Sequence, residues 1–312
     1  MPKIERLKYP RPRARKIPLA EVKEFLEEKG YTVVKLWQPW RHVVGIVKKG
    51  NDKAFFKLGT TLKISKMTEN EFLWNDLVGN NLDTNAPFVV PQGFEKGMYK
   101  ERLFYYMSDY YEGDTLADKK PPSTKNLAIW IPKIARAAYL IDNISIPEQY
   151  KSPKNSAGIR LFDSASEWGS QLSSDVSLLL EIIESSKRHI RVALNHGDFV
   201  PWHMHDLGSG RFALVDAEHG GPRPKYYDVA YFYTRVRQSL GEGELARKFL
   251  LEFKGLLPDK DKEVFWKELK PVLAQRLVGN FWEVETSHEV GSDIDLKRCE
   301  EFKKDLVGDK II

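Results

Sequence analysis

Two aspartates lie eighteen positions apart in the stretch LNHGDFVPWHMHDLGSGRFALVDAEHGG, which covers residues 194 to 221. Asp198 follows a His-Gly pair in a loop-like segment, whereas Asp216 comes at the end of the apolar run FALV, which is typical of a strand. Phosphoryl transfer from a nucleotide needs one carboxylate to orient or deprotonate the acceptor hydroxyl and oxygen ligands to hold Mg²⁺ between the phosphates. The two positions therefore indicate Asp198 as a base and Asp216 as a metal ligand.

The composition is that of a folded protein and excludes several other classes. Of the 312 residues, 42% are hydrophobic and 30% are charged. The single cysteine, Cys299, cannot form an internal disulfide or supply a cysteine-based metal site. No apolar run approaches the ~20 residues that span a bilayer, and the N-terminus lacks the apolar segment of a secretion signal. We therefore expect a cytoplasmic location and no membrane partner.

A basic N-terminal arm is expected over residues 1–17. The formal net charge of the chain is +5, and much of the excess lies among the lysines and arginines of this arm. Such an arm could contact nucleic acid or an acidic partner. A solvated terminus containing Pro10 and Pro12 is the favoured interpretation, so nucleic acid is not an expected partner.

The elements before residue 108 predict a small α+β lobe over residues 18–107. A helix is expected to open at Pro18 and to end at Gly30. The runs YTVVKLW, VVGIVKK and KAFFKLG then read as strands, with a tight turn in KKGND between the second and third. SKMTENEFLWNDLVG has helical spacing and ends at Gly79, and FVVPQGFE and RLFYYM return to strand.

The remainder, residues 108–312, predicts a larger and mainly helical lobe. The helical segments are NLAIWIPKIARAAYLIDNI and SEWGSQLSSDVSLLLEIIESSKRHI before the aspartate stretch, and YYDVAYFYTRVRQSL, GELARKFLLEFKGL and KEVFWKELKPVLAQRLVGNFWEVE after it. The polar segment 148–155 reads as a loop. The predicted fold class is therefore α+β, with a small antiparallel β-rich N-terminal lobe and a larger helical C-terminal lobe.

HGDFVPWH followed by LVDAEHGGPRPKYYDVA resembles the aminoglycoside phosphotransferase and choline kinase superfamily, whose members share the bilobal protein-kinase-like fold. The resemblance implies Asp198 as the catalytic base and Asp216 as the Mg²⁺ ligand. It further implies that His196 and Asp228 support the catalytic loop.

Upstream segments extend the resemblance over nearly the whole chain after the basic arm. Lys57 in AFFKLG matches the strand lysine that contacts nucleotide phosphates, and Glu71 matches its helix partner. YMSDYYEGDTL resembles the hinge, where Met107 and Asp109 are expected at the nucleotide. The implied cofactors are ATP or GTP with Mg²⁺, or Mn²⁺. The residues alone also permit a solvent-facing Lys57 and a Glu71 that closes a capping box with Thr68.

The sequence departs from the family pattern at His203, where the family has asparagine. An imidazole nitrogen is a poor ligand for Mg²⁺, which prefers oxygen. Three outcomes are open: His203 hydrogen-bonds Asp198 while water completes the metal shell, it favours Mn²⁺, or the site turns over poorly. LWQPWRHVVG also lacks the glycines of a phosphate-covering loop, so backbone amides, Arg41 or His42 would replace them.

The acceptor site is expected on the C-terminal helices, as in the resembling family. NFWEVETSHEVGSDID contributes Trp282 and Glu285, and Glu218 is a further candidate for contact with the substrate. Carboxylates with an aromatic ring could hold a cationic amino-sugar or a quaternary amine. A solvated acidic segment is the alternative interpretation.

The leading hypothesis is a small-molecule kinase that transfers the γ-phosphate of ATP or GTP to a hydroxyl of a small, aminoglycoside-like or amino-alcohol-like acceptor. The alternative is a catalytically weak nucleotide-binding regulatory protein on the same fold, and the two hypotheses diverge at His203. A nucleic-acid-associated protein that uses the basic arm is a third. The sequence predicts neither the identity of the acceptor nor an oligomeric state.

Overall fold

The computed structural model describes residues 14–148, 156–286 and 294–311, and these residues form two compact units. Within them, the first unit takes its residues from Met1–Leu82, Val89–Gly113 and Ala213–Gly220, and the second from Asp83–Phe88, Asp114–Phe212 and Gly221–Ile312. Most of the expected basic arm and of the expected loop 148–155 lies outside the described residues. The predicted α+β fold class is confirmed, because an antiparallel sheet combines with many helices.

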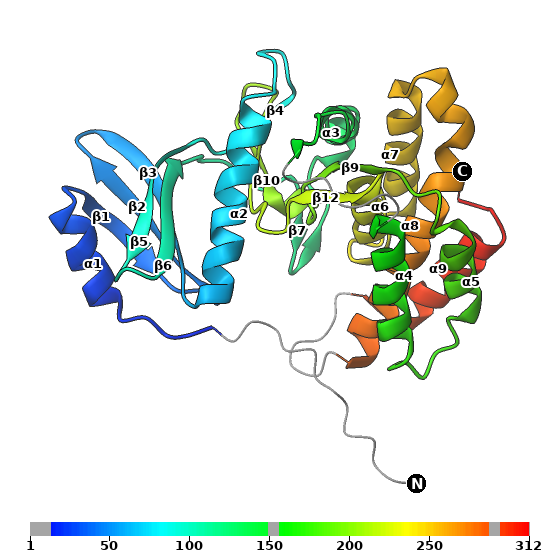
Figure 1. The fold of residues 1–312 in the computed structure, drawn as a ribbon. Coiled ribbons are helices and arrows are strands. Elements are labelled where there is room, and N and C mark those ends of the chain that lie inside the picture. Colours follow the sequence, from blue (N-terminus) through cyan, green and yellow to red (C-terminus); the bar gives the residue numbers. More distant parts are fainter. Residues whose placement is uncertain (1–13, 149–155, 287–293, 312) are drawn as a thin grey trace, which may run out of the picture. The chain divides into compact units, whose positions relative to one another are not determined.

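The first unit is built on a five-stranded antiparallel sheet with the order β1-β2-β3-β6-β5 (Figure 1). The predicted tight turn in KKGND lies between β2 and β3, where Gly50 has a φ of +65°. In chain order the elements of this unit are α1 (Leu19–Glu28), β1 (Thr32–Trp37), β2 (His42–Lys49), β3 (Asp52–Gly59), α2 (Leu62–Gly79), β5 (Gly93–Tyr99) and β6 (Leu103–Asp109).

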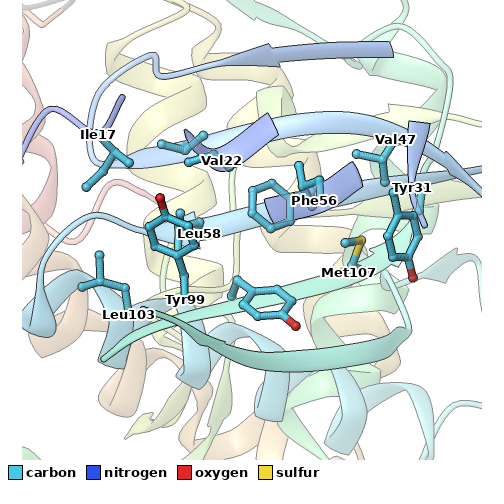
Figure 2. Packing of buried hydrophobic residues seen from close by; sticks show 13 residues of the cluster. Ile17, Val22, Tyr31, Val47, Phe56, Leu58, Tyr99, Leu103 and Met107 are labelled. Carbon is cyan, nitrogen blue, oxygen red and sulfur yellow. The ribbon is translucent and has the colours of Figure 1, made fainter. Parts of the chain in front are cut away.

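One face of this sheet carries the core beneath α1. Figure 2 shows Val22 of α1 together with Phe56 and Leu58 of β3 and Met107 of β6, and all four side chains are fully buried. Successive side chains of a strand point to opposite faces of a sheet. Lys57, between Phe56 and Leu58, therefore points to the other face.

That other face is covered by α2, which packs against β3 and β6. Gly59, at the end of β3, permits this approach, because a Cβ there would lie 2.6 Å from the backbone of Ser65. The helix ends at Gly79 as predicted, but it begins at Leu62, where the side chain of Thr61 caps it by accepting from the N–H of Ile64. The predicted start was too late, and the capping-box interpretation of Glu71 is wrong because that residue lies in the helix interior.

The second unit consists mainly of helices arranged around α8. This long helix contacts α4, α5, α6 and α9, and most of its C-terminal half is buried on all sides. The segment SEWGSQLSSDVSLLLEIIESSKRHI, expected to be helical, is interrupted after Gly169, where α4 ends. No helix among the described residues is both long and apolar enough to cross a membrane. The helices are α3 (Leu127–Asp142), α4 (Ser156–Gly169), α5 (Ser177–Ser186), α6 (Tyr227–Gln238), α7 (Gly243–Leu256), α8 (Asp259–Thr286) and α9 (Leu296–Val307).

Short strands of the second unit flank the His196-Gly197-Asp198 motif. β9 (Val192–Asn195) leads into the motif and pairs antiparallel with β12 (Gly221–Pro224), which leads into α6. The short helix η2 (Pro201–His203) and β10 (Met204–Asp206) follow the motif, and β7 (Asp118–Lys119) and β8 (Pro122–Ser123) form a small hairpin. The chain passes between the two units within β4 (Phe88–Val89) and β11 (Phe212–Leu214).

Candidate active site

Lys57 is the centre of a buried ionic group in the first unit. Its ammonium nitrogen Nζ lies 2.5 Å from Glu71 Oε2 and 2.9 Å from Asp216 Oδ1. The lysine is 6% exposed and Glu71 is 3% exposed, whereas the side chain of Asp216 retains 37% of its exposure. One buried cation is therefore shared by two carboxylates, one of which reaches solvent. We call these three residues the lysine cluster.

The charges of the lysine cluster favour a protonated lysine. Burial lowers the pKa of Lys57, but the negative charges of Asp216 and Glu71 outweigh burial and hold that pKa well above its usual value. Burial also raises the pKa of the Glu71 carboxyl, and the lysine opposes this shift. Lys57 therefore stays positively charged, and its position between β3 and α2 is fixed by its carboxylate partners.

Contacts with α2 hold the segment that carries Asp216. Asn70 Nδ2 donates to the backbone carbonyls of Glu218 (3.3 Å) and Gly220 (2.9 Å). A Cβ at Gly220 would lie 2.4 Å from the ring of Trp74, so only glycine permits this close approach. Asp216 itself has a φ of +67°, in the left-handed region that costs an L-residue about 1 kcal/mol. The fold thus fixes the direction of this carboxylate.

A second ionic contact in the same unit was not predicted. The Arg41 guanidinium pairs with the buried Glu218 carboxylate, and His42 Nε2 lies 3.5 Å from the other oxygen of that carboxylate. Burial raises the pKa of Glu218 to about 7, while burial and then the charge of Lys57 lower the pKa of His42 to about 2. His42 is therefore neutral, and Arg41 supplies the positive charge at the start of β2. The partners are 177 positions apart, so no sequence spacing signals this pair.

Asp228 fixes the loop that carries His196, Gly197 and Asp198 in the second unit. Its carboxylate accepts the backbone N–H groups of His196 at 2.6 Å and Gly197 at 2.9 Å. Its own N–H donates to Asn195 Oδ1 at 3.0 Å. Burial raises the pKa of Asp228 to about 7, and the two accepted N–H groups oppose that shift. The structure thus brings His196 and Asp228 together and fixes the backbone just before Asp198.

Asp198 and His203 lie on either side of one loop turn. His203 Nδ1 is 3.1 Å from the backbone carbonyl oxygen of Asp198 and 3.7 Å from its carboxylate oxygen Oδ2. A carbonyl oxygen only accepts, so Nδ1 carries a hydrogen, and in the neutral ring the lone pair is on Nε2. The side chain of Asp198 is 27% exposed. The carboxylate is therefore partly exposed, while the imidazole holds the loop backbone.

No protein-family model matches the sequence, and no curated protein matches it. Several solved structures are similar. The aminoglycoside phosphotransferase APH(4)-Ia matches with a TM-score of 0.63 and 15% identity over 94% of this chain and 98% of its own. Aminoglycoside 2′-phosphotransferase-IIIa, in its GDP complex, matches with a TM-score of 0.60 and 13% identity over 94% and 98%. This chain has the aminoglycoside phosphotransferase fold.

Another structure with the aminoglycoside phosphotransferase fold is a thermostable APH(4)-Ia mutant in a ternary complex with ADP and hygromycin B. It matches with a TM-score of 0.62 and 15% identity over 93% of this chain and 98% of its own. The resemblance predicted from HGDFVPWH and LVDAEHGG is confirmed at the level of the fold.

The two residues expected at the hinge, Met107 and Asp109, have their side chains engaged in contacts within the first unit. The side chain of Met107 lies in the core beneath α1, and its strand pairs on both sides with neighbours in the sheet. Asp109 Oδ2 accepts from the N–H of Gln92 at 3.0 Å and from the Tyr111 hydroxyl at 3.3 Å. A nucleotide contact of these two residues stays a prediction, and for Met107 it would have to come from the main chain.

Trp282 and Glu285, the two helix residues expected at the acceptor, pack against α4 and the loop that follows it. Trp282 on α8 stacks on Trp168, with ring centroids 6.3 Å apart. Glu285 accepts the backbone N–H groups of Ser173 at 2.6 Å and Ser174 at 3.1 Å. These hydrogen bonds occupy both oxygens of the Glu285 carboxylate. A substrate contact of Trp282 and Glu285 stays a prediction that the local geometry does not favour.

Proposed function

We propose that this protein is a small-molecule kinase, which transfers the γ-phosphate of ATP or GTP to a hydroxyl of a small acceptor. The observation that carries the proposal is the buried, protonated Lys57 between Glu71 and Asp216. A buried ammonium is costly unless its partners are held in place, and such a fixed point charge suits the binding of phosphate oxygens. Similar structures include complexes with ADP and with GDP.

The first unit supplies nucleotide binding in this proposal. Lys57 binds the phosphates, and Glu71 is a positioning residue that holds the ammonium. The exposed carboxylate of Asp216 is the hard oxygen ligand that Mg²⁺ prefers, so this residue fits the metal. The other expected metal ligand, His203, belongs to the second unit, and its nitrogen fits Mn²⁺ better than Mg²⁺. The metal, when bound, neutralises the charge that develops on the phosphates.

The second unit supplies the chemistry of the acceptor. Asp198 accepts the proton of the acceptor hydroxyl while the hydroxyl oxygen forms a bond to the γ-phosphorus. The bond from that phosphorus to the bridging oxygen breaks, and the nucleoside diphosphate leaves with the electron pair. Asp228 is a positioning residue, because it accepts the N–H groups of His196 and Gly197 and so fixes the backbone that leads into Asp198.

A catalytically weak nucleotide-binding regulator is the second candidate, and His203 is the residue that favours it. Asparagine would offer an amide oxygen to the metal, whereas the imidazole offers only the Nε2 lone pair. The two candidates share nucleotide binding and differ in turnover.

Turnover of ATP and GTP separates the two candidates. Release of the nucleoside diphosphate is measured with Mg²⁺ or Mn²⁺, alone and with a panel of hydroxylated amino-sugars, amino-alcohols, sugar acids and sugar phosphates. The kinase predicts that one acceptor class accelerates release and that EDTA abolishes it. The matched control is Arg136→Gln, an exposed site on α3, which should behave as the parent. Metal-dependent nucleotide binding without turnover would support the regulator, and absence of nucleotide binding would contradict both.

A further inference from the structure

A group of arginines and tyrosines gathers in the second unit beside the catalytic loop. Tyr227, Tyr231 and Arg235 are spaced four apart on α6 and so share one face of that helix. Residues of α8 and β12 complete the group. The arginine–tyrosine cluster consists of Arg223, Tyr227, Tyr231, Arg235, Arg276 and Glu283.

The tyrosine rings hold the guanidinium groups in place. The rings of Tyr227 and Tyr231 stack with centroids 6.0 Å apart. The Arg276 guanidinium lies 4.4 Å from the centroid of Tyr231, and its Nη1 donates to the Tyr227 hydroxyl at 3.1 Å. Arg235 lies 5.5 Å from the same Tyr231 ring. Two guanidiniums therefore flank one aromatic ring in fixed positions.

The cluster lies next to Asp198. Asp228, in the first turn of α6, holds the loop before Asp198, and Phe232 of α6 contacts Phe199 with ring centroids 6.0 Å apart. The charge of Asp198 also acts on Tyr231. Burial raises the pKa of Tyr231 to about 12, and the negative charge of Asp198 contributes to that shift. A molecule whose hydroxyl reaches Asp198 can therefore reach this face of α6.

Among the described residues, the two buried guanidiniums Arg235 and Arg276 have fewer carboxylate partners than charges. Arg235 and Arg276 are 7% and 9% exposed, and Arg235 Nη2 pairs with Glu283 at 2.9 Å. Within the described ranges, Arg276 makes no ion pair with a carboxylate. Two buried donors have no hydrogen-bond partner among the described residues, namely Nε of Arg276 and Nη1 of Arg235. A buried guanidinium left in this state is strongly unfavourable, although a neighbouring aromatic ring compensates for part of the cost.

We propose that the acceptor of the phosphoryl group carries a carboxylate or phosphate group, which binds to Arg276 and Arg235 while the acceptor hydroxyl contacts Asp198. The inference rests on the proposed function and names its substrate class. An oxyanion would accept from the two unpartnered guanidinium donors and restore the charge balance. The cationic acceptor expected from the sequence finds less support, because Glu283 pairs with Arg235 and Glu285 caps a loop.

Anion binding gives the first test and does not require turnover. Thermal unfolding of the full chain is measured at constant ionic strength with inorganic phosphate, malonate or choline chloride. Phosphate also suits the nucleotide lysine, so the titration is repeated in Lys57→Met. We expect phosphate or malonate to raise the melting temperature in the parent and in Lys57→Met, whereas choline does not. Whichever anion acts shows whether a phosphate or a carboxylate is preferred.

The arginine variant decides where the anion binds. Arg276→Gln should weaken the apparent anion affinity about tenfold or more, because a charged donor pair is lost. Arg276→Lys, which keeps the charge without the planar fork, should give a smaller loss and serves if the glutamine variant does not fold. The exposed control Arg136→Gln should match the parent. An anion effect that is lost in Lys57→Met and retained in Arg276→Gln would overturn the inference, as would the absence of any anion effect.

Acceptors that share one carbon skeleton give the second test. Glucose, glucosamine, gluconate and glucose 6-phosphate are compared as acceptors with saturating nucleotide. We expect kcat/KM to be at least tenfold higher for an anionic acceptor, and Arg276→Gln to remove this preference mainly through KM. A preference for glucosamine that Arg276→Gln leaves unchanged would refute the inference while the kinase proposal stands. Retained anion binding with no turnover of any acceptor would instead refute the proposed function.

Discussion

The lysine cluster of the first unit and the arginine–tyrosine cluster of the second unit have opposite charge imbalances. In the first, Lys57 has two carboxylate partners. In the second, Arg235 and Arg276 have one carboxylate partner within the described residues, Glu283, and tyrosine side chains supply further contacts. A buried charge is retained when a partner compensates for it. The comparison therefore indicates a cation as the missing partner of the first cluster and an anion as the missing partner of the second.

A third ionic group has one carboxylate more than it has cations, and burial raises the pKa of one of its carboxyls, that of Asp142. Lys225 lies 3.1 Å from Asp261 Oδ2 and 3.8 Å from Asp142 Oδ2, and Arg191 pairs with both Asp261 and Glu268. Two cations and three carboxylates alternate in this group, which connects α3, α8 and the turn before α6. We assign this group to stability, and it serves as the reference for the other two.

The largest effect is expected at Asp198, which belongs to neither cluster. Asp198→Asn keeps the size of the side chain and removes the base, so phosphoryl transfer should fall about 10²- to 10⁴-fold. Turnover with saturating metal-nucleotide and acceptor is the measurement. If turnover in the variant equals that of the parent, both clusters could still bind their ligands, but Asp198 would have no part in the reaction.

Breaking the lysine cluster should give the next largest effect. Lys57→Met removes the cation and should lower kcat/KM for nucleotide about tenfold or more, while Glu71→Gln should give a smaller loss because it acts only through the lysine. The double variant should lose less than the sum of the two single losses. A double-mutant cycle on kcat/KM measures this coupling, and strict additivity would show that the 2.5 Å contact has no functional role.

A smaller effect is expected at His203. His203→Asn retains a donor for the Asp198 carbonyl and adds an amide oxygen that suits Mg²⁺. We expect Mg²⁺-supported turnover to rise several-fold relative to Mn²⁺-supported turnover. The ratio of the two rates is measured in parent and variant. Lower turnover with both metals would instead show that the imidazole orients the loop in a way that asparagine cannot replace.

The reference group should respond to pH. Burial raises the pKa of Asp142 from 3.8 to about 6, and Lys225 opposes the shift. The folded state therefore binds more protons than the unfolded state between about pH 4 and 6, and this carboxyl destabilises the fold as pH rises through that window. Asp142→Asn should make the free energy of unfolding less dependent on pH by up to about 2 kcal/mol. The free energy of unfolding is measured with denaturant at pH 4, 5 and 6. If it changes with pH equally in parent and variant, the raised pKa of Asp142 is contradicted.

Much of the fold, and the contact between Lys57 and Glu71 in the candidate site, could be predicted because local patterns carry them. The strand period places Lys57 opposite the core face, and the order of lysine, helix glutamate and two aspartates indicated the fold. The start of α2 was missed because Thr61 caps the helix before its apolar periodicity begins. The spacing of Tyr227, Tyr231 and Arg235 on one helix face was visible in the sequence. Their significance depends on Arg276, which is 49 positions from Tyr227 and is placed there only by packing.

Nucleotide affinity tests the central claim most directly, namely that the lysine cluster binds the nucleotide while the second unit handles the acceptor. Calorimetric titration of Mg²⁺-ATP and Mg²⁺-GTP is performed on the parent, Lys57→Met, Asp198→Asn and Arg276→Gln. We expect the parent to bind one of the nucleotides, Lys57→Met to bind it at least tenfold more weakly, and the other two variants to stay within about twofold of the parent. Unchanged affinity in Lys57→Met, or an equal loss in Arg276→Gln, would contradict the account.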